Sequence, residues 1–204
     1  MKIYATADIH GSQYRLNMAL DAIEHHHPDL VVICGDITQF GPADAAKNIL
    51  NQIPCETFAL PGNIDSEDVS KGIEKSNATN LHLKKISFKG INYVGINGVN
   101  EKDSLKVLND ESFKDLMTDA TVLVTHTPPH GFQDKVFLGM HAGNKTIRKI
   151  VDLYQPRLVL CGHIHEDPGI TTHQEMTIVN CSMGKRGAGA IISLNDTISA
   201  SMIK

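Results

Sequence analysis

Short apolar runs alternate along the first third of the chain with stretches in which apolar residues recur every three or four positions. The apolar runs have the length of buried strands and lie at 2–7, 30–34 and 56–60. The stretches with helical spacing follow each of them, at 13–27, 42–52 and 66–76. Strands that alternate with helices in this way favour a parallel sheet with helices packed on its faces.

The first of these helices has the clearest boundaries. Ser12 can accept a hydrogen bond from the first turn, so it is the expected N-cap. Leu16, Leu20 and Ile23 form one apolar face. Pro28 cannot continue a helix, so the helix is expected to end before it.

The rest of the chain is richer in strands than its beginning. Strand-like runs lie at 85–97, where two strands meet near Lys89 and Gly90, at 121–125 and at 158–161. The pattern also predicts a helix at 143–154 and three strands within 170–203, with turns near 182–189 and 195–196. No internal repeat or linker divides the chain, so we expect one α/β domain over 1–204 with two sheets packed together.

Composition and charge narrow the classes of function. The chain of 204 residues has 19 basic and 23 acidic side chains and a net charge of −4, which argues against an overall basic surface for nucleic acid. The longest purely apolar run, 30–34, is far shorter than the roughly 18 residues of a membrane span. Asp8 lies where a secretory signal would need apolar residues, so we expect a cytoplasmic protein. The four cysteines form no CxxC pair, and the three in or beside apolar runs are expected to be small core residues.

Side chains that can ligate metals follow five of the predicted strands at their C-terminal ends. In chain order they are Asp8 and His10, Asp36, Asn63, His126, and His163 and His165. Because the C-terminal ends of parallel strands form one edge, where α/β proteins place their sites, we expect these side chains to converge. An isolated Asp-x-His or His-x-His is usually incidental, but here every member of the set lies at a strand end.

The donor types of this set fit divalent transition metals. Imidazoles suit Zn, Fe, Mn or Ni, carboxylates and an amide oxygen suit Mn, Fe or Mg, and none of the candidates is a thiolate. Asp8 and His10 are two residues apart, as are His163 and His165, and a straight strand would point both members of a pair to one side. Seven donors exceed one tetrahedral site and suit two ions that share a bridging carboxylate.

The ordered set resembles the motifs of the calcineurin-like metallophosphoesterases. The segments that carry the resemblance are Asp8-Ile9-His10, Gly35-Asp36, Gly62-Asn63-Ile64-Asp65, Thr125-His126 and Gly162-His163-Ile164-His165. The resemblance extends from residue 1 to about residue 185. It implies an α/β sandwich of two mixed β-sheets flanked by helices, with a metal site at the C-terminal edge of the strands.

The resemblance also implies how the seven residues divide between two divalent ions. One ion would be held by Asp8, His10, Asp36 and His165, and the other by Asp36, Asn63, His126 and His163. Asp36 would bridge the two ions and so take a direct part in catalysis. The activity implied is hydrolysis of a phosphoester by a bridging hydroxide, and Mn, Fe, Zn and Ni all remain open as the metals.

The chain departs from the larger family at Ile64. Many members have a histidine there that faces the leaving group, whereas isoleucine can neither donate nor accept a proton. The small branch of cap-less phosphodiesterases also tends to lack this histidine. We therefore expect phosphodiesters to be preferred over monoesters, and Asp65, without its usual partner, to cap the helix that starts at Ser66.

Two groups could assist catalysis from loops. His141, within a His-x-Gly element, could reach the phosphate or the leaving oxygen, and His130 is a weaker alternative. Lys185 and Arg186 could hold a phosphate oxygen, but a solvated turn is the simpler explanation. His141 is the predicted catalytic residue besides Asp36.

Two classes of function follow from the sequence. The first is an enzyme that acts on a small phosphoester, without nucleic acid or membrane as a partner; its oligomeric state is left open. The second is a protein-interaction scaffold with little catalysis, a role that one vacuolar-sorting member of the family has adopted. All seven candidate positions retain coordinating side chains, which favours the enzyme, because nothing would otherwise offset the cost of clustered buried charges.

Overall fold

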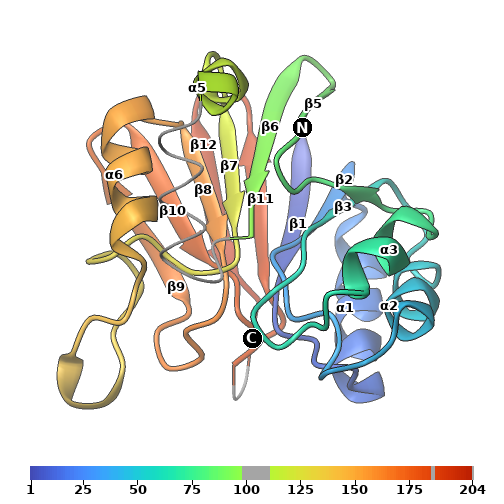
Figure 1. Ribbon diagram of the computed structural model, residues 1–204. Coiled ribbons are helices and arrows are strands. Elements are labelled where there is room, and N and C mark those ends of the chain that lie inside the picture. The colour runs from blue at the N-terminus through green and yellow to red at the C-terminus, as the bar shows by residue number, and fades with distance from the viewer. Residues whose placement is uncertain (98–110, 185–186, 204) are drawn as a thin grey trace.

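Two six-stranded sheets form the centre of the molecule in a computed structural model that describes residues 1–97, 111–184 and 187–203 (Figure 1). In the first sheet the strand order is β12-β11-β1-β2-β3-β4. Its strands are β1 (Lys2–Thr6), β2 (Leu30–Ile33), β3 (Thr57–Ala59), β4 (Thr79–Asn80), β11 (Ala190–Leu194) and β12 (Ile198–Met202). β1 to β4 run parallel to one another, β11 pairs antiparallel with β1, and β12 pairs antiparallel with β11, so the sheet is mixed.

The second sheet has the order β5-β6-β7-β8-β10-β9. Its strands are β5 (Lys85–Phe88), β6 (Ile91–Ile96), β7 (Val122–Thr125), β8 (Leu158–Cys161), β9 (Gly169–His173) and β10 (Met176–Asn180). The four central strands are parallel, and the two edge strands pair antiparallel to them. The expected sandwich of two mixed sheets is therefore confirmed.

Helices cover the outer face of each sheet (Figure 1). Those on the first sheet are α1 (Gln13–His26), α2 (Ala43–Leu50) and α3 (Val69–Glu74). Those on the second are α5 (Glu111–Met117) and α6 (Lys145–Tyr154). A short 3-10 helix, η1 (Phe137–Gly139), lies in the loop between β7 and α6. None of the helices in the described ranges is long and apolar enough to cross a membrane.

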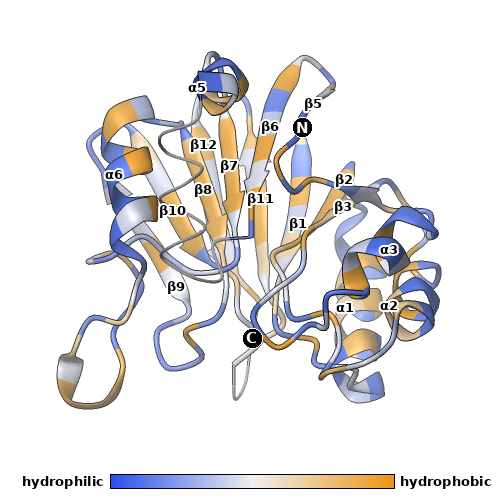
Figure 2. Ribbon diagram, viewed as in Figure 1, coloured by the Kyte–Doolittle hydropathy of each residue, from blue (hydrophilic) through white to orange (hydrophobic). Residues whose placement is uncertain are grey.

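The apolar residues separate into three layers, because successive residues of a strand face opposite sides of its sheet. In β1, Ile3 and Ala5 belong to the core between the two sheets, whereas Tyr4 packs with Leu16 of α1. A third cluster lies between the second sheet and its helices and includes Val159 and Ile150. Figure 2 shows the same arrangement, with hydrophobic strands inside and hydrophilic positions on the helices around them.

The last third of the chain contains four strands rather than the three expected. The missed turn joins β9 to β10 through two residues, Gln174 and Glu175. Gln174 adopts a left-handed conformation with φ of 54°. Turns of this kind usually carry glycine or asparagine, so a Gln-Glu pair gave no signal in the sequence.

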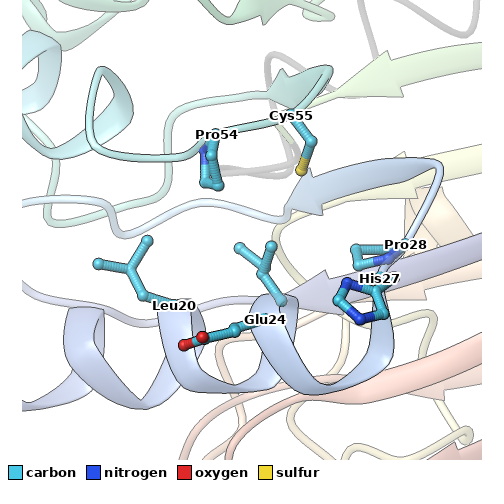
Figure 3. Close-up of a pocket in the computed structure, with 7 residues that line it drawn as sticks. Leu20, Glu24, His27, Pro28, Pro54 and Cys55 are labelled. Atoms are coloured by element: carbon cyan, nitrogen blue, oxygen red, sulfur yellow. The ribbon is translucent and has the colours of Figure 1, made fainter.

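The boundaries of α1 agree with the sequence. The side chain of Ser12 accepts a hydrogen bond from the Arg15 backbone N–H at 3.4 Å, and His27 ends the helix in a left-handed conformation. A hollow of about 480 Å³ lies at this end of α1, beside the segment that precedes β3 (Figure 3). Its lining residues are Leu20, Ile23, Glu24, His27, Pro28, Pro54 and Cys55, and none of them is a candidate metal ligand.

Candidate metal centre

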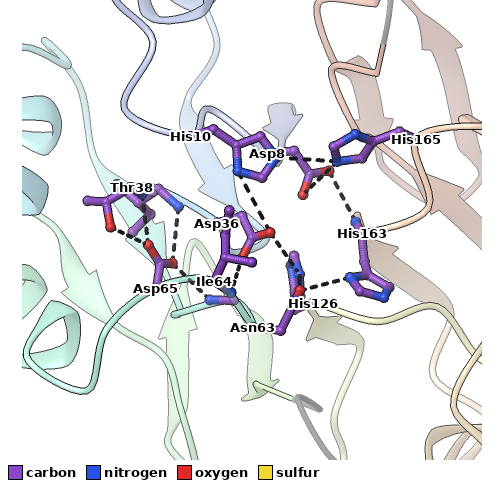
Figure 4. Close-up of polar contacts among 12 residues, drawn as sticks. Asp8, His10, Asp36, Thr38, Asn63, Ile64, Asp65, His126, His163 and His165 are labelled. Atoms are coloured by element: carbon purple, nitrogen blue, oxygen red, sulfur yellow. Dashed lines mark hydrogen bonds and ion pairs between the residues drawn. The ribbon is translucent and has the colours of Figure 1, made fainter. Parts of the chain in front are cut away.

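The seven candidate ligands lie just beyond the C-terminal ends of five parallel strands. The first sheet supplies Asp8 and His10 after β1, Asp36 after β2 and Asn63 after β3. The second sheet supplies His126 after β7, and His163 and His165 after β8. Because the two sheets end at the same edge, side chains up to 157 positions apart in the sequence meet there (Figure 4).

Contacts between these side chains begin with Asp8 and run through two histidines to Asp36. The Oδ1 atom of Asp8 lies 3.5 Å from Nε2 of His165. That nitrogen lies 3.4 Å from Nε2 of His10. The other ring nitrogen of His10, Nδ1, lies 3.9 Å from Oδ2 of Asp36.

The contacts return from Asp36 to Asp8 along the second sheet. Oδ2 of Asp36 lies 3.5 Å from Nε2 of His126, which lies 2.8 Å from Oδ1 of Asn63. The same amide oxygen lies 2.9 Å from Nδ1 of His163. The backbone N–H of His163 donates to Oδ2 of Asp8 at 3.1 Å. The structure thus brings all seven residues into one closed ring of contacts, visible in Figure 4.

Left-handed backbone conformations aim four of the ligands into the ring. Asp8, His10, Asp36 and His163 have φ of 65°, 54°, 53° and 69°. Non-glycine residues seldom adopt this region, and such strain concentrates at functional sites. The geometry differs from the straight strands that the two-residue spacings suggested, because both pairs lie beyond the strand ends.

Two glycines allow the ligand-bearing loops to approach closely. A Cβ atom at Gly62 would overlap the carboxylate and the backbone nitrogen of Asp36. A Cβ atom at Gly35 would lie 2.5 Å from Nδ1 of His126, and Gly35 also has a φ of 96°. Any larger residue at either position would therefore displace a candidate ligand.

The orientation of His126 is fixed from behind. Its Nδ1 lies 2.8 Å from the backbone carbonyl of Cys34, and the ring is completely buried. Only an Nδ1–H can donate to that carbonyl, so in the neutral ring the lone pair is on Nε2, which faces Asp36 and Asn63. Second contacts of this kind are typical of metal-ligating histidines.

The ring also contains buried polar atoms that make no hydrogen bond, although they lie near groups of opposite charge. In the described part of the chain, the buried atoms Oδ1 of Asp8 and Nδ1 of His10 accept or donate no hydrogen bond. Two groups of three residues have ligand atoms within 4.8 Å of one another. The first group is Asp8, His10 and His165, and the second is Asp8, Asp36 and His126. Unpaired buried acceptors are costly, and a cation would satisfy them, so the residues present fit a metal centre.

The electrostatics keep the Asp8 carboxylate ionised. Burial alone would raise the pKa of Asp8, but the contact with His165 and the charge of His126 outweigh burial and lower the pKa to about 2. An ionised, fully buried carboxylate needs compensating positive charge. Asp8 is thus set up to face a cation.

The four histidines divide into two groups. Burial lowers the pKa of His10 and His163, and neighbouring carboxylates only partly oppose it. For His126 the effect of burial is outweighed by Asp36, so its pKa is raised. The pKa of His165 is raised mainly by its contact with Asp8. Protons therefore compete for this site chiefly at His126 and His165.

Asp65 joins two ligand-bearing loops instead of capping a helix. Its carboxylate accepts hydrogen bonds from the backbone N–H groups of Ile37, Thr38 and Gly62, at 3.0, 2.7 and 2.9 Å. It also accepts one from the Thr38 hydroxyl at 2.8 Å. The prediction that Asp65 caps the next helix is therefore wrong. That helix begins only at Val69, and the backbone N–H groups of the ligand-bearing loops are the donors closer to the carboxylate.

The contacts of His141 lie within its own loop. Its Nδ1 lies 2.6 Å from Oδ1 of Asp134, a fully buried carboxylate that also accepts from the N–H groups of Gly131 and Gly143. The His130 ring lies 5.6 Å from the His141 ring. A catalytic role for His141 thus stays a prediction, and Asp134 is the anchor of this loop that the sequence did not reveal. Lys185 and Arg186 lie outside the described residues.

A comparison with protein families decides the classification of this site. The sequence model of the calcineurin-like phosphoesterases matches residues 1–167, a range that contains all seven residues of the ring. The chain belongs to the calcineurin-like phosphoesterase family. The family implies divalent metal cofactors, which agrees with the donor atoms of this calcineurin-like phosphoesterase.

Relatives of this calcineurin-like phosphoesterase occur in archaea and animals. An uncharacterised protein of Methanocaldococcus jannaschii, MJ1162, is 32% identical over 199 residues, which cover 89% of this chain and 88% of the relative. The UPF0046 protein K07C11.7 of Caenorhabditis elegans is 27% identical over 139 residues, covering 60% of this chain and 46% of the worm protein.

Solved structures share the fold of this calcineurin-like phosphoesterase. The protein TT1561 of Thermus thermophilus superposes with a TM-score of 0.75 and 14% identity, covering 100% of this chain and 99% of that one. A protein described as a novel archaeal phosphodiesterase superposes with a TM-score of 0.58 and 12% identity over the whole of both chains. At these identities the likeness concerns the fold.

Proposed function

We propose that this metal-dependent phosphoesterase hydrolyses phosphodiesters, with two divalent ions held in the seven-residue ring. The closed ring of contacts from Asp8 back to Asp8 carries the proposal, because it contains more donors than one ion can use. The archaeal phosphodiesterase of the same fold supports the choice of reaction.

One triplet of nearby ligand atoms, together with the contacts of Asn63, suggests how the ions would be divided; the other triplet, Asp8, Asp36 and His126, spans both sets. Asp8, His10 and His165, joined by Asp36, would hold one ion, and Asp36, Asn63, His126 and His163 would hold the other. Asp36 contacts a histidine on each side, so its carboxylate is the natural bridge. The mixture of imidazole, carboxylate and amide donors suits Mn, Fe, Zn or Ni.

When bound, the ions would polarise the phosphoryl group and supply a nucleophilic water at neutral pH. The chain itself fixes the donors that this chemistry needs. Asp36 is held by the Ile64 N–H, which donates to its Oδ1 at 3.1 Å, while Oδ2 faces the histidines. His126 is held through Nδ1 by the Cys34 carbonyl, which directs Nε2 toward Asp36 and Asn63.

Ile64 decides which phosphoesters suit this site. Its half-buried side chain lies beside Asp36, where it cannot protonate a departing oxygen (Figure 4). A positioned acid contributes on the order of 10²- to 10⁴-fold to such reactions. The site therefore favours substrates whose leaving group needs little protonation. It also favours singly charged diesters, whose second organic group can lie against the isoleucine, over doubly charged monoesters.

The test compares two substrates with the same leaving group. With Mn²⁺ present, bis(p-nitrophenyl) phosphate is expected to be hydrolysed faster than p-nitrophenyl phosphate. Asp36→Asn and His126→Ala are expected to lose at least about 100-fold in activity, since even outer contacts of metal sites are worth 10- to 100-fold. The matched control is Asp44→Asn, an exposed carboxylate on α2. A clear monoester preference would contradict the diester proposal.

His141 is tested separately as the proposed source of a proton. Loss of about 100-fold in kcat for His141→Ala, with full activity of His25→Ala at the end of α1, would support a role in catalysis. Unchanged turnover in His141→Ala would remove the candidate. Its pairing with the buried Asp134 is what singles it out from the other loop histidines.

Binding without catalysis is the second candidate function. Ile64 favours it, and so do the exposed apolar side chains of Phe137, Leu138 and Met140 around η1, which are 76%, 82% and 58% exposed. This scaffold would retain metal affinity and bind a protein, but it would hydrolyse neither aryl substrate. Activity that disappears in Asp36→Asn excludes it.

A further inference from the structure

A hollow of about 380 Å³ opens beside the metal centre. It is lined by His10, Ser12, Arg15, Gln39 and Ile64. His10 belongs to the ring of candidate ligands, so the hollow is continuous with the site. None of its walls is an acidic side chain, and Arg15 contributes a full positive charge.

Arg15 is held so that its guanidinium stays beside the site. Nη1 donates to the backbone carbonyl of Asp8 at 2.5 Å, and Nη2 lies 3.5 Å from the carbonyl of Gly184. A guanidinium has five N–H donors, so three remain for another acceptor. The side chain is half-buried, which restricts where these donors can point.

The guanidinium of Arg15 contacts backbone carbonyls but no carboxylate in the described part of the chain. In the described ranges no carboxylate lies within ion-pair distance of it, unlike Arg148, whose Nε lies 2.9 Å from both oxygens of Asp152. Arg15 also lies in the first turn of α1, where the helix dipole disfavours a cation. A positive charge at such a position is available to an anion from outside the chain.

We propose that Arg15 binds a non-bridging oxygen of the substrate phosphate and that the hollow receives one ester group of the substrate. This assignment rests on the proposed phosphodiesterase function. The planar guanidinium fits phosphate oxygens in pairs. Ile64 offers an apolar wall, and the Gln39 amide and the Ser12 hydroxyl offer uncharged polar contacts, so the ester group taken is a neutral organic one.

The experiment compares Arg15→Gln and Arg15→Lys with the wild type in the Mn²⁺-loaded protein. Inorganic phosphate is the probe, measured as a competitive inhibitor and by the shift in melting temperature that it causes. Arg157→Gln is the matched control, because Arg157 also donates to two backbone carbonyls, those of Asn195 and Asp196, at 3.0 and 2.7 Å.

Arg15→Gln is expected to weaken phosphate inhibition and raise KM by about 10- to 100-fold, the range for hydrogen bonds to charged groups. Arg15→Lys keeps the positive charge but loses the planar pair of donors, and phosphate inhibition is expected to weaken at least threefold in it. This variant carries the test if Arg15→Gln does not fold. Mn²⁺ affinity is expected to remain within twofold of the wild type. Arg157→Gln is expected to match the wild type in every measurement.

Two outcomes would overturn the assignment. Phosphate inhibition within twofold of the wild type in both variants would leave Arg15 as a tether alone. A loss of phosphate affinity that merely follows a loss of Mn²⁺ affinity would have the same meaning. If the wild type binds phosphate through Arg15 yet hydrolyses no phosphoester, the proposed function fails and the anion site stands.

Discussion

At the scale of single residues, the identity of the candidate ligands was predictable and their conformation was not. Each ligand follows an apolar run, and that placement is visible in the sequence. The left-handed φ angles of Asp8, His10 and Asp36 cannot be predicted from the sequence, because these residue types occur in many backbone conformations. Arg15 was missed for a similar reason: it looks like any polar position of an amphipathic helix.

Asp65 gives the first prediction at this scale. Asp65→Ala removes the acceptor of three backbone N–H groups and is expected to lower the free energy of unfolding by at least about 2 kcal/mol, because those donors lose their partner. Chemical denaturation measures the loss. Asp68→Ala, three positions later on the exposed surface, is the control and is expected to change stability by less than about 0.5 kcal/mol.

The raised pKa values of His126 and His165 predict how metal affinity depends on pH. Metal ions need neutral imidazoles, so protons on these two rings compete with the ions above the ordinary histidine value of 6.5. Mn²⁺ affinity is expected to rise between pH 6 and 8, with protons released on binding, as calorimetry in two buffers would show. An affinity that is flat over this range would contradict the assignment, because Asp8, with a pKa of about 2, is ionised throughout.

At the scale of elements, hydrophobic spacing predicted the helices and strands with strong periodicity. α1, α6 and the buried strands β2, β7 and β8 lie close to their expected positions. The elements that were missed are short, such as β4 with two residues and η1 with three, or depend on pairing, such as the β9–β10 hairpin. Tertiary contacts form these elements, and the local sequence contains little of that information.

The loop between β7 and α6 carries the element-scale prediction. Asp134 holds this loop through the N–H groups of Gly131 and Gly143 and through His141. Asp134→Ala is expected to speed hydrogen exchange at those two amides by about tenfold or more, since each loses a charged acceptor. Asp152→Ala, which removes an exposed carboxylate of α6, is the control. Unchanged exchange at Gly131 and Gly143 would contradict the anchoring role.

At the scale of the whole molecule, the site lies where two sheets meet. The first sheet supplies four of the candidate ligands and the second supplies three, so no ion can be held by one sheet alone in the proposed division. The order of strands and candidate ligands along the sequence predicted that the site lies at this edge, because every candidate ligand follows a strand. The relative placement of the two sheets comes from the apolar core between them, which requires the structure.

Metal removal therefore acts on the stability of the whole fold. Ions that bind the folded chain at about 100 times their dissociation constant stabilise it by roughly 2.7 kcal/mol. Chelation by EDTA is expected to lower the melting temperature by roughly 5–10 °C for a chain of this length. Asp36→Ala is expected to show no such shift; an equal shift in that variant would place the stabilising metal elsewhere.

The central claim is that the ring of seven residues holds a pair of ions. Anomalous diffraction from crystals loaded with Mn²⁺ tests it most directly. Two anomalous peaks are expected inside the ring, about 3.5–4 Å apart, with Asp36 between them. A single peak, or peaks away from these side chains, such as at the run of histidines that ends α1, would contradict it.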